Sequence, residues 1–272
     1  MREPAIAAWP APVLRRFGAV NWVGLYALYR RELLRVLKFY PESVFGPTAM
    51  SLLYLVVFHF ALGGEGVTMG GLPLIEFVAP GLVIYTLCER AFDTTSISLL
   101  FDKLEGMITD ILMAPLSAAE RTAAYAGSAA SAGFVVGGVV LAAQCLFVPL
   151  SFANPLAILF FAVAGALLHA LAGIIVGLWA ARWDHYAAAT TFFVVPFGFL
   201  SGTFYSIEAL PPLGRLLVQL NPVFYVIDGF RYGFTGHAEG SLAIGVALLL
   251  AVDAVLLVVV YRLVRRGFRL KP

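Results

Sequence analysis

The stretch TAAYAGSAASAGFVVGGVVLAAQCLFVPLSFANPLAILFFAVAGALLHALAGIIVGLWAA, residues 122–181, contains no Asp, Glu, Lys or Arg. An apolar helix needs about 20 residues to cross the hydrocarbon core of a bilayer, so this stretch is long enough for two crossings. The segment PLSFANP (149–155) divides it, and its two prolines and its asparagine predict a turn. Residues 122–148 and 156–181 are therefore predicted as two transmembrane helices.

The composition of the whole chain is that of a membrane protein. Of its 272 residues, 61% are hydrophobic and 12% are charged, whereas an ordinary soluble domain has roughly 25% charged residues. The same spacing of charges predicts four more spans, at 43–63, 76–100, 186–207 and 240–261. The predicted fold is an all-α membrane protein with six transmembrane helices between residues 43 and 261.

The basic residues predict the orientation of the chain. Seven Lys or Arg precede the first span and five follow the last, so the positive-inside rule places both termini, 1–42 and 262–272, in the cytoplasm. Before the first span, apolar residues recur at helical spacing while Arg31, Arg35 and Lys38 fall on another face, which predicts an interfacial amphipathic helix. Whether that helix contacts only anionic lipid or also a protein partner stays open at this point.

Residues 208–237, between the fifth and sixth spans, are too apolar for a solvated loop. Their uncharged pieces are too short to cross a bilayer. Pro211, Pro212 and the pair Asn221-Pro222 interrupt the segment. It is predicted to form short interfacial or re-entrant helices on the outer side, where protein or a water-filled cavity covers the irregular backbone.

Three charged residues, Glu89, Arg90 and Asp93, fall within the second predicted span. Ionisable groups at membrane depth are costly and usually face a bundle interior, a partner or water. They either form a polar patch on a transport path or subunit interface, or form a structural ion pair, since Arg90 and Asp93 are spaced i, i+3. Asp253, alone in the last span, is interpreted as a contact within the bundle.

Aromatic residues are dense in the fifth predicted span and in the segment that follows it. They could line a path for an apolar or amphiphilic substrate, or could belong to ordinary lipid contacts and the interfacial aromatic belt. The candidates for the substrate path, together with the three charged residues, are Phe193, Phe197, Phe204, Tyr205 and Tyr225.

The inner loop between the second and third spans predicts a short cytoplasmic amphipathic helix at about 105–116. It has an apolar stripe, two acidic residues and a proline that ends the helix. Acidic residues argue against a helix resting on the negative inner leaflet, so a docked protein is the favoured neighbour. The residues assigned to docking are Glu105, Gly106, Met107, Ile108, Asp110, Ile111, Leu112 and Pro115.

No group of residues supports catalysis, and no catalytic residue is assigned. A phosphate-binding loop needs the pattern G-x-x-x-x-G-K-[ST], which no lysine of the chain satisfies, so ATP would bind to another polypeptide. The four histidines are scattered, and Cys88 and Cys145 lie in apolar runs, where they are interpreted as small core residues. No metal site, disulfide, cofactor or nucleic-acid partner is predicted.

Three segments together resemble the membrane subunits of type-2 ATP-binding-cassette exporters: VAPGLVIY (78–85), EGMITDILMAPLSAAER (105–121) and FLSGTFYSIEALPPLGRLLVQLNPVFYVIDGFRYGFTG (199–236). The likeness is to the compact bacterial branch that exports drugs, nodulation factors or polysaccharides. It implies an inner-membrane permease, not itself an enzyme, that pairs with a second permease copy in a homodimer or heterodimer. Each copy would dock on a separate ATPase, which carries ATP and Mg, through a coupling helix at 105–116, and residues 204–232 would close the path from outside.

Two other classes of protein are weighed against this interpretation. An ATP-independent secondary transporter or channel usually contains an inverted repeat with paired broken helices, and the two halves of this sequence show no such duplication. An intramembrane enzyme would need a nucleophile with a base, or a set of metal ligands, which the sequence does not contain.

Overall fold

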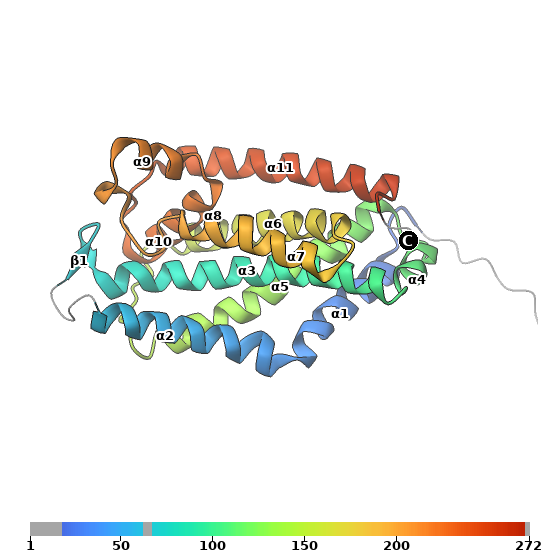
Figure 1. Cartoon of the computed structure of the whole chain (residues 1–272), viewed down its shortest axis with the longest axis horizontal. Coiled ribbons are helices and arrows are strands. Elements are labelled where there is room, and N and C mark those ends of the chain that lie inside the picture. Colours follow the sequence, from blue (N-terminus) through green and yellow to red (C-terminus); the bar gives the residue numbers. More distant parts are fainter. Residues whose placement is uncertain (1–17, 62–66, 270–272) are drawn as a thin grey trace, which may run out of the picture.

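The computed structural model describes residues 18–61 and 67–269, in which long helices form a single bundle (Figure 1). The inner loop and the C-terminal end of the chain lie at one end of the bundle, and the short outer helices lie at the other. Predictions that concern residues 1–17, 62–66 and 270–272 lie outside the described residues.

The first half of the bundle contains one short hairpin among its helices. Its elements are α1 (Trp22–Lys38), the π-helical η1 (Pro41–Phe45), α2 (Gly46–Ala61), β1 (Thr68–Met69), β2 (Leu72–Pro73), α3 (Leu74–Leu104), α4 (Ile108–Met113) and α5 (Ala118–Gln144). The two strands pair antiparallel. The second half is helical: α6 (Pro155–Trp179), α7 (Trp183–Ala189), the π-helical η2 (Thr190–Val194), α8 (Val195–Phe199), the 3₁₀ turn η3 (Ile207–Ala209), α9 (Pro212–Gln219), α10 (Pro222–Thr235) and α11 (Leu242–Arg266).

Helix α3 forms the centre of the bundle and packs closely against α5 and α6. Small residues permit this close approach. A Cβ atom placed on Gly173 of α6 would lie 2.4 Å from the carbonyl oxygen of Phe92, and one on Gly133 of α5 would lie 2.7 Å from that of Leu87. The backbones of these helices are therefore nearly in contact with α3, and larger residues at the two glycines would force them apart.

Four of the predicted spans appear as helices long and apolar enough to cross a membrane: Pro41–Phe60, Ala118–Gln144, Pro155–Trp179 and Leu242–Arg266. The second predicted span corresponds to α3, which is long enough but carries charges at its middle. The fifth is shorter than predicted, because the chain passes from α7 through η2 to α8 and leaves the helix after Phe199. The all-α class is confirmed, apart from the two-residue hairpin.

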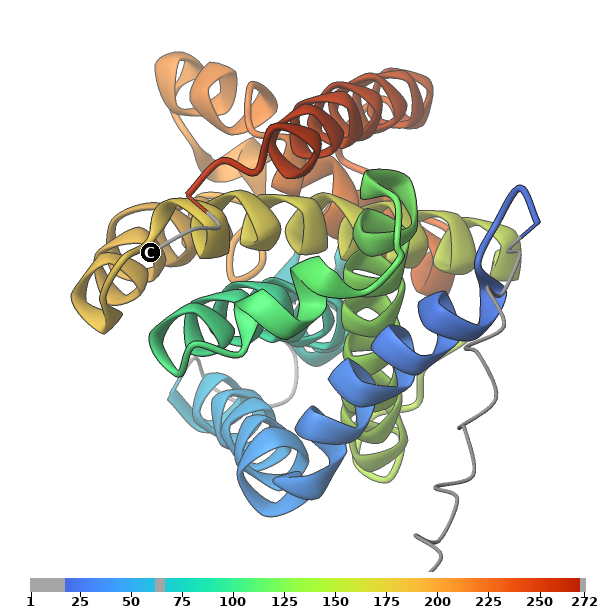
Figure 2. The same ribbon diagram turned by 90° about the vertical axis from the view of Figure 1, so that its right-hand side faces the viewer.

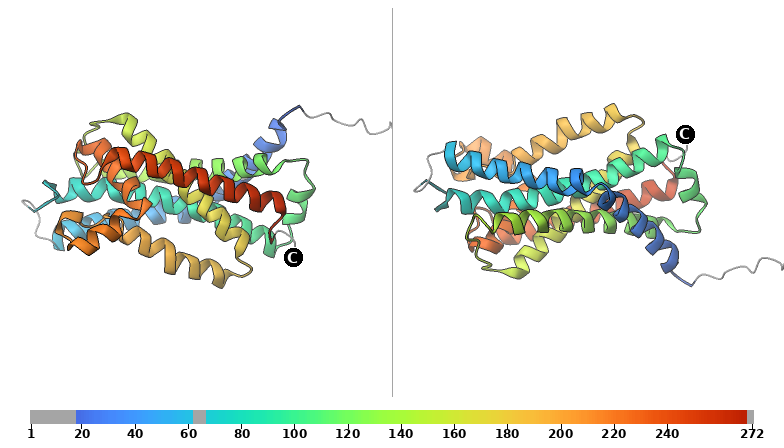
Figure 3. Two further views of the ribbon diagram at one scale, coloured as in Figure 1. Left: turned by 90° about the horizontal axis from the view of Figure 1, so that it is seen from above. Right: turned by 90° about the horizontal axis from the view of Figure 1, so that it is seen from below.

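The N-terminal amphipathic helix is present as α1, and η1 joins it to α2 at a bend (Figure 3). Seen from the end of the bundle, α1 crosses α5 (Figure 2). Leu28 and Glu32 face the bundle, whereas Trp22, Val23 and Tyr26 are exposed. The exposed face of α1 is thus aromatic and apolar near its N-terminus, as expected of a helix that rests at an interface.

Short helices occupy the segment where the sequence predicts them, at the end of the bundle opposite α4 (Figure 1). Asn221 caps α10 by accepting a 3.0 Å hydrogen bond from the backbone N–H of Val223. Gly236, at a φ of +72°, ends that helix in the left-handed conformation that glycine adopts without strain. Helix α10 is buried against α3, α6 and α11, while the leucines of α9 are exposed.

Candidate functional site

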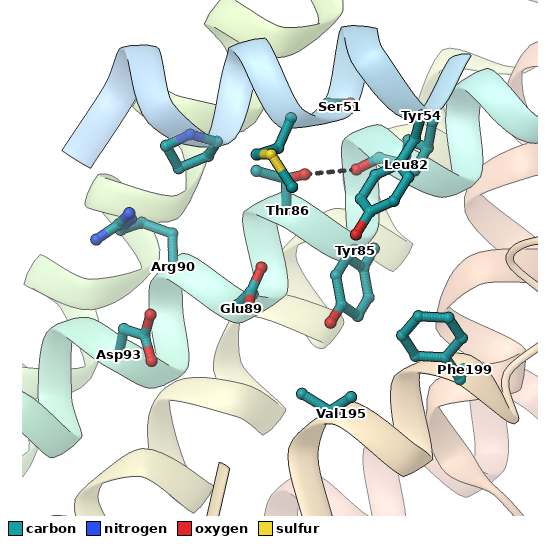
Figure 4. A pocket seen from close by; sticks show the side chains of 12 residues that line it. Ser51, Tyr54, Leu82, Tyr85, Thr86, Glu89, Arg90, Asp93, Val195 and Phe199 are labelled. Atoms are coloured by element: carbon teal, nitrogen blue, oxygen red, sulfur yellow. Dashed lines mark hydrogen bonds between the residues drawn. The ribbon is translucent and has the colours of Figure 1, made fainter. Parts of the chain in front are cut away.

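A cleft of about 380 Å³ opens between α2, α3 and α8, and the charged residues that the sequence singled out lie along it (Figure 4). Glu89, Arg90 and Asp93 all contribute to its lining. The remaining lining residues are Pro47, Met50, Ser51 and Tyr54 of α2, Leu82, Tyr85 and Thr86 of α3, and Val195 and Phe199 of α8. The cleft therefore combines two carboxylates and a guanidinium with aromatic and apolar walls.

The ion pair expected between Arg90 and Asp93 is not formed. Asp93 Oδ1 accepts a 2.6 Å hydrogen bond from the hydroxyl of Tyr186 in α7. Among the described residues, no carboxylate oxygen lies within 4.0 Å of the Arg90 guanidinium. That guanidinium points away from the carboxylates of Glu89 and Asp93 (Figure 4). Of the two interpretations of these charges, the i, i+3 ion pair is not present, and Tyr186, a residue from a distant segment, binds the Asp93 carboxylate instead.

One of the aromatic candidates, Phe204, lies against the wall of this cleft. The ring of Phe204 stacks on Phe58 with a centroid distance of 5.2 Å and meets Tyr54 edge-on at 6.0 Å. It also lies 5.2 Å from Phe199, which lines the cleft. Tyr205 is partly buried and packs against the main core. Phe204 thus belongs to a group of aromatic rings that includes Tyr54 and Phe199 of the cleft wall.

The other aromatic candidates lie elsewhere. Phe193 and Phe197 line a second cleft of about 200 Å³, which includes His169 of α6. Tyr225 is buried, and its ring packs against Gly245 of α11. The structure therefore does not bring all the predicted path residues into one space, because the fifth predicted span presents different residues to different neighbours.

The inner loop turns at Gly106, whose φ of +75° favours glycine, and α4 follows. Ile108 and Ile111 of α4 are only 3% and 6% exposed and belong to the core of this chain. Asp110 and Met113 are exposed on the other side of the helix. The two isoleucines that the sequence assigned to docking thus face the bundle of this chain and anchor the short helix to it.

The remaining docking candidates surround that short helix. Glu105 is exposed, Met107 and Leu112 are half-buried, and Pro115 follows the helix. The Pro115 carbonyl accepts a 3.1 Å hydrogen bond from the side-chain amide of Asn21, at the start of α1. The inner loop is therefore held at both ends, by the bundle core and by α1.

A capping box begins α5 directly after the loop. The Ser117 hydroxyl accepts a 3.2 Å hydrogen bond from the Glu120 N–H, and a Glu120 carboxylate oxygen accepts one of 2.6 Å from the Ser117 N–H. The other oxygen of Glu120 accepts the N–H of Asn21. One side chain thus joins the start of α1 to the start of α5.

An ionic cluster that the sequence interpretation missed lies beside the inner loop. Asp102 of α3 is fully buried, and its two carboxylate oxygens pair with Arg31 and, at 2.8 Å, with Arg35 of α1. Glu32, 1% exposed, pairs with Arg31 and accepts the hydroxyl of Ser98. Arg31 and Arg35, predicted on the polar face of an interfacial helix, thus attach α1 to α3. No local pattern signals this pairing, since its partners are 71 and 67 residues apart.

A buried arginine holds the outer end together. Arg231 of α10, which the sequence placed outside the membrane, is 1% exposed. Its Nε donates to the Phe77 carbonyl at 2.9 Å and Nη2 to the Gly202 carbonyl at 2.7 Å, while the guanidinium stacks on the Phe77 ring, 3.6 Å from the centroid. Asp228 accepts the N–H groups of the loop after α10. These contacts tie α10 to the start of α3.

The two cysteines and Asp253 differ in their burial. Cys88 is buried as expected, but Cys145 is exposed at the end of α5, so its interpretation as a core residue is wrong. Asp253 is buried within the bundle, with one carboxylate oxygen that has no hydrogen-bond partner among the described residues. No three His, Cys, Asp or Glu side chains gather into a possible metal site within 18–61 and 67–269.

Apolar helices of membrane-spanning length, packed around a central helix with a charged cleft at its side, are the architecture of a multi-pass membrane protein. The family model of the ABC-2 type transporter matches residues 24–235. The chain belongs to this family. The matched region includes the cleft, the inner loop and the buried α10.

Relatives of similar sequence support the assignment to a membrane transporter family. The inner membrane transport permease YadH of Escherichia coli K12 is 29% identical over 246 residues, which are 90% of this chain and 96% of the relative. Nodulation protein J of Rhizobium leguminosarum bv. trifolii is 29% identical over 233 residues, covering 81% of this chain and 83% of the relative. Nodulation protein J of Neorhizobium galegae is 26% identical over 247 residues. Family and relatives together indicate a membrane transport permease.

Proposed function

We propose that this chain is the transmembrane subunit of an ATP-binding-cassette exporter and works as a homodimer with a separate ATPase that binds ATP and Mg. The observation that carries this proposal is the family match, which extends over the cleft and the inner loop alike. The name of the relative YadH, an inner membrane permease, supports the bacterial inner membrane as the location. The exported substrate would be apolar or amphiphilic, such as a drug, lipid or glycan.

The proposed topology has six spans: α2, α3, α5, α6, the segment from α7 to α8, and α11. Helix α4, the start of α1 and the C-terminal end lie at one end of the bundle (Figure 1). That end would be cytoplasmic, because the last two turns of α11 carry Arg262, Arg265 and Arg266. The short helices α9 and α10 would then lie at the outer surface, with α10 as the re-entrant element.

The cleft between α2, α3 and α8 is proposed as one half of the substrate path. Its charged residues meet apolar walls, a combination suited to an amphiphilic molecule. Beside it, Met50 and Leu53 of α2 and Phe197 of α8 are about half exposed. A second copy of the chain, placed against these residues, would cover them and complete the path.

Helix α4 is proposed as the coupling element, with a different docking face from the one that the sequence favoured. Its buried isoleucines hold it rigidly on the bundle, while Glu105, Asp110 and Met113 remain available to an ATPase. Motion of the docked ATPase would pass to α3 through the inner loop and to α1 through Asn21. A fixed lever of this kind transmits a shift between two states.

The test of this proposal is a charge reversal on the docking face. We expect Asp110→Lys to reduce co-purification of the ATPase and ATP-driven transport by about tenfold or more, equivalent to 1.4 kcal/mol of binding. Asp184→Lys is the matched control, since Asp184 is an exposed acid near the start of α7. Normal ATPase binding and transport by Asp110→Lys would exclude α4 as the coupling element. Transport by the chain without any ATPase would favour an ATP-independent transporter.

A further inference from the structure

A second groove, of about 620 Å³, lies between α5, α6 and α11 and shares no lining residue with the cleft. Its α5 wall consists mainly of small side chains, including Ala123 and Ala130. The other walls are apolar side chains of α6 and α11, and Tyr261 of α11 carries a hydroxyl; these walls comprise Val163, Leu167, Leu257, Val258 and Tyr261. Because the lining is almost wholly apolar, the natural occupant is a hydrocarbon chain.

The length of the groove corresponds to one leaflet of a bilayer. On α5 the lining residues run from Ala119 to Ala130, a rise of about 17 Å at 1.5 Å per residue. Half of a hydrocarbon core about 30 Å thick is close to this length. The groove begins at the end of α5 next to the inner loop, which is the proposed cytoplasmic end. It therefore fits one acyl chain of the inner leaflet.

The mouth of the groove carries positive charge. Arg262, Arg265 and Arg266 are all exposed at the end of α11. With 3.6 residues per turn, Arg265 lies on the same face as Tyr261 and Leu257, one and two turns before it, whereas Arg266 points about 100° away. The acid nearest to the mouth on α5, Glu120, is held in the capping box.

We propose that this groove binds one anionic phospholipid of the inner leaflet. Its acyl chain would lie between α5, α6 and α11, and its phosphate would meet Arg265 and the Tyr261 hydroxyl. A guanidinium suits this task because its planar N–H groups match phosphate oxygens. The proposal rests on the proposed orientation of the chain, since the basic end must face the anionic cytoplasmic leaflet.

The bound lipid would also border α1. Gly127 lines the groove, and a Cβ placed on it would lie 3.7 Å from the Tyr29 ring. The Tyr29 hydroxyl shares a 2.8 Å hydrogen bond with Ser131 of α5. A lipid in the groove would therefore support the contact between α1 and α5, on which the inner loop depends through Asn21.

The experiment counts lipids on the purified chain by native mass spectrometry during titration with phosphatidylglycerol or with phosphatidylcholine of identical acyl chains. We expect one phosphatidylglycerol to bind at about a tenfold lower concentration than phosphatidylcholine. Arg265→Gln should remove that preference, and Arg266→Gln, its matched control, should keep it. Ala123→Leu, which fills the groove from an exposed position, should lower the affinity for both lipids, whereas Ala142→Leu, exposed on α5 outside the groove, should not.

Each alternative occupant or cause gives a different result. Equal binding of the two lipids by the unchanged chain would overturn the proposal, because only annular lipid would then be present. If Arg265→Gln still preferred phosphatidylglycerol over phosphatidylcholine, Arg265 would not bind the lipid phosphate, and the proposed role of the groove's mouth would be overturned. Loss of the lipid on dimerisation, together with a weaker dimer in Ala123→Leu, would show that a second copy fills the groove instead. Unchanged unfolding temperatures of the variants would exclude a folding defect.

Discussion

The ionic cluster beside the inner loop leads to a quantitative prediction for Asp102→Ala. Asp102 is fully buried and pairs with both Arg31 and Arg35. Its removal leaves the two guanidinium groups without this partner, although Glu32 still pairs with Arg31 and, at 3.7 Å, with Arg35. We expect α1 to loosen from α3 and the chain to unfold at a lower temperature.

The size of the effect follows from the burial of the partners. Removing one member of a buried ion pair costs about 3–5 kcal/mol. The side chains of Arg31 and Arg35 are 35% and 26% exposed, so water replaces part of the lost interaction, and the expected cost falls to about 2–3 kcal/mol. For a chain of this size, each kcal/mol lowers the unfolding temperature by about 2–4 °C. The expected shift is therefore about 4–12 °C.

A buried cysteine provides the assay. Cys88 is 2% exposed, so a maleimide that fluoresces on reaction with its thiol reports unfolding, in a Cys145→Ser background that removes the exposed thiol. Heating at one fixed scan rate makes irreversible transitions comparable. Asp110→Asn, an exposed acid just beyond α3, is the control and should shift the transition by no more than about 0.5 kcal/mol. If Asp102→Ala and this control unfolded at the same temperature, the ionic cluster would not contribute to stability, and the prediction would be refuted.

Three further predictions concern packing, transport and topology. Gly173→Ala should destabilise the chain by about 1–3 kcal/mol, because its Cβ would meet the backbone of α3. Gly138→Ala, with open space around it, should stabilise the chain by about 0.5–1 kcal/mol. Equal unfolding temperatures of the two variants would contradict the close contact between α3 and α6. Glu89→Gln should lower transport severalfold without loss of assembly, whereas Glu76→Gln, on the same helix but outside the cleft, should leave transport unchanged. Equal transport by both variants would show that the cleft is not part of the substrate path. A cysteine at Asp110 should react with an impermeant reagent only in opened cells, and labelling of intact cells would invert the topology.

The positions of the long helices follow from the sequence. The charge-free stretches predicted 122–148 and 156–181, and the structure has Ala118–Gln144 and Pro155–Trp179. A bilayer offers no hydrogen-bond partners, so each spanning segment must satisfy its own backbone as a helix, and apolar length alone then indicates where the helix lies. The short outer helices were equally predictable, because proline and asparagine mark their starts.

The fifth predicted span shows where this rule stops. Its apolar sequence continues to residue 207, but the helix ends at Phe199. Gly198 lies against the ring of Tyr85, and the backbone that follows is held by Arg231 through the Gly202 carbonyl. Because buried protein groups such as Arg231 supply hydrogen bonds to this backbone, the apolar segment after Phe199 does not have to be helical.

Residue pairing was decided by the tertiary structure alone. The sequence by itself determined that the chain is a membrane protein of several apolar helices and which charges are costly at depth. It offered the nearest pairing, Arg90 with Asp93, because local spacing is all that a sequence displays. Folding instead brought Tyr186 to Asp93 and α1 to Asp102, since buried charges take the partners that helix packing presents to them, however distant along the chain.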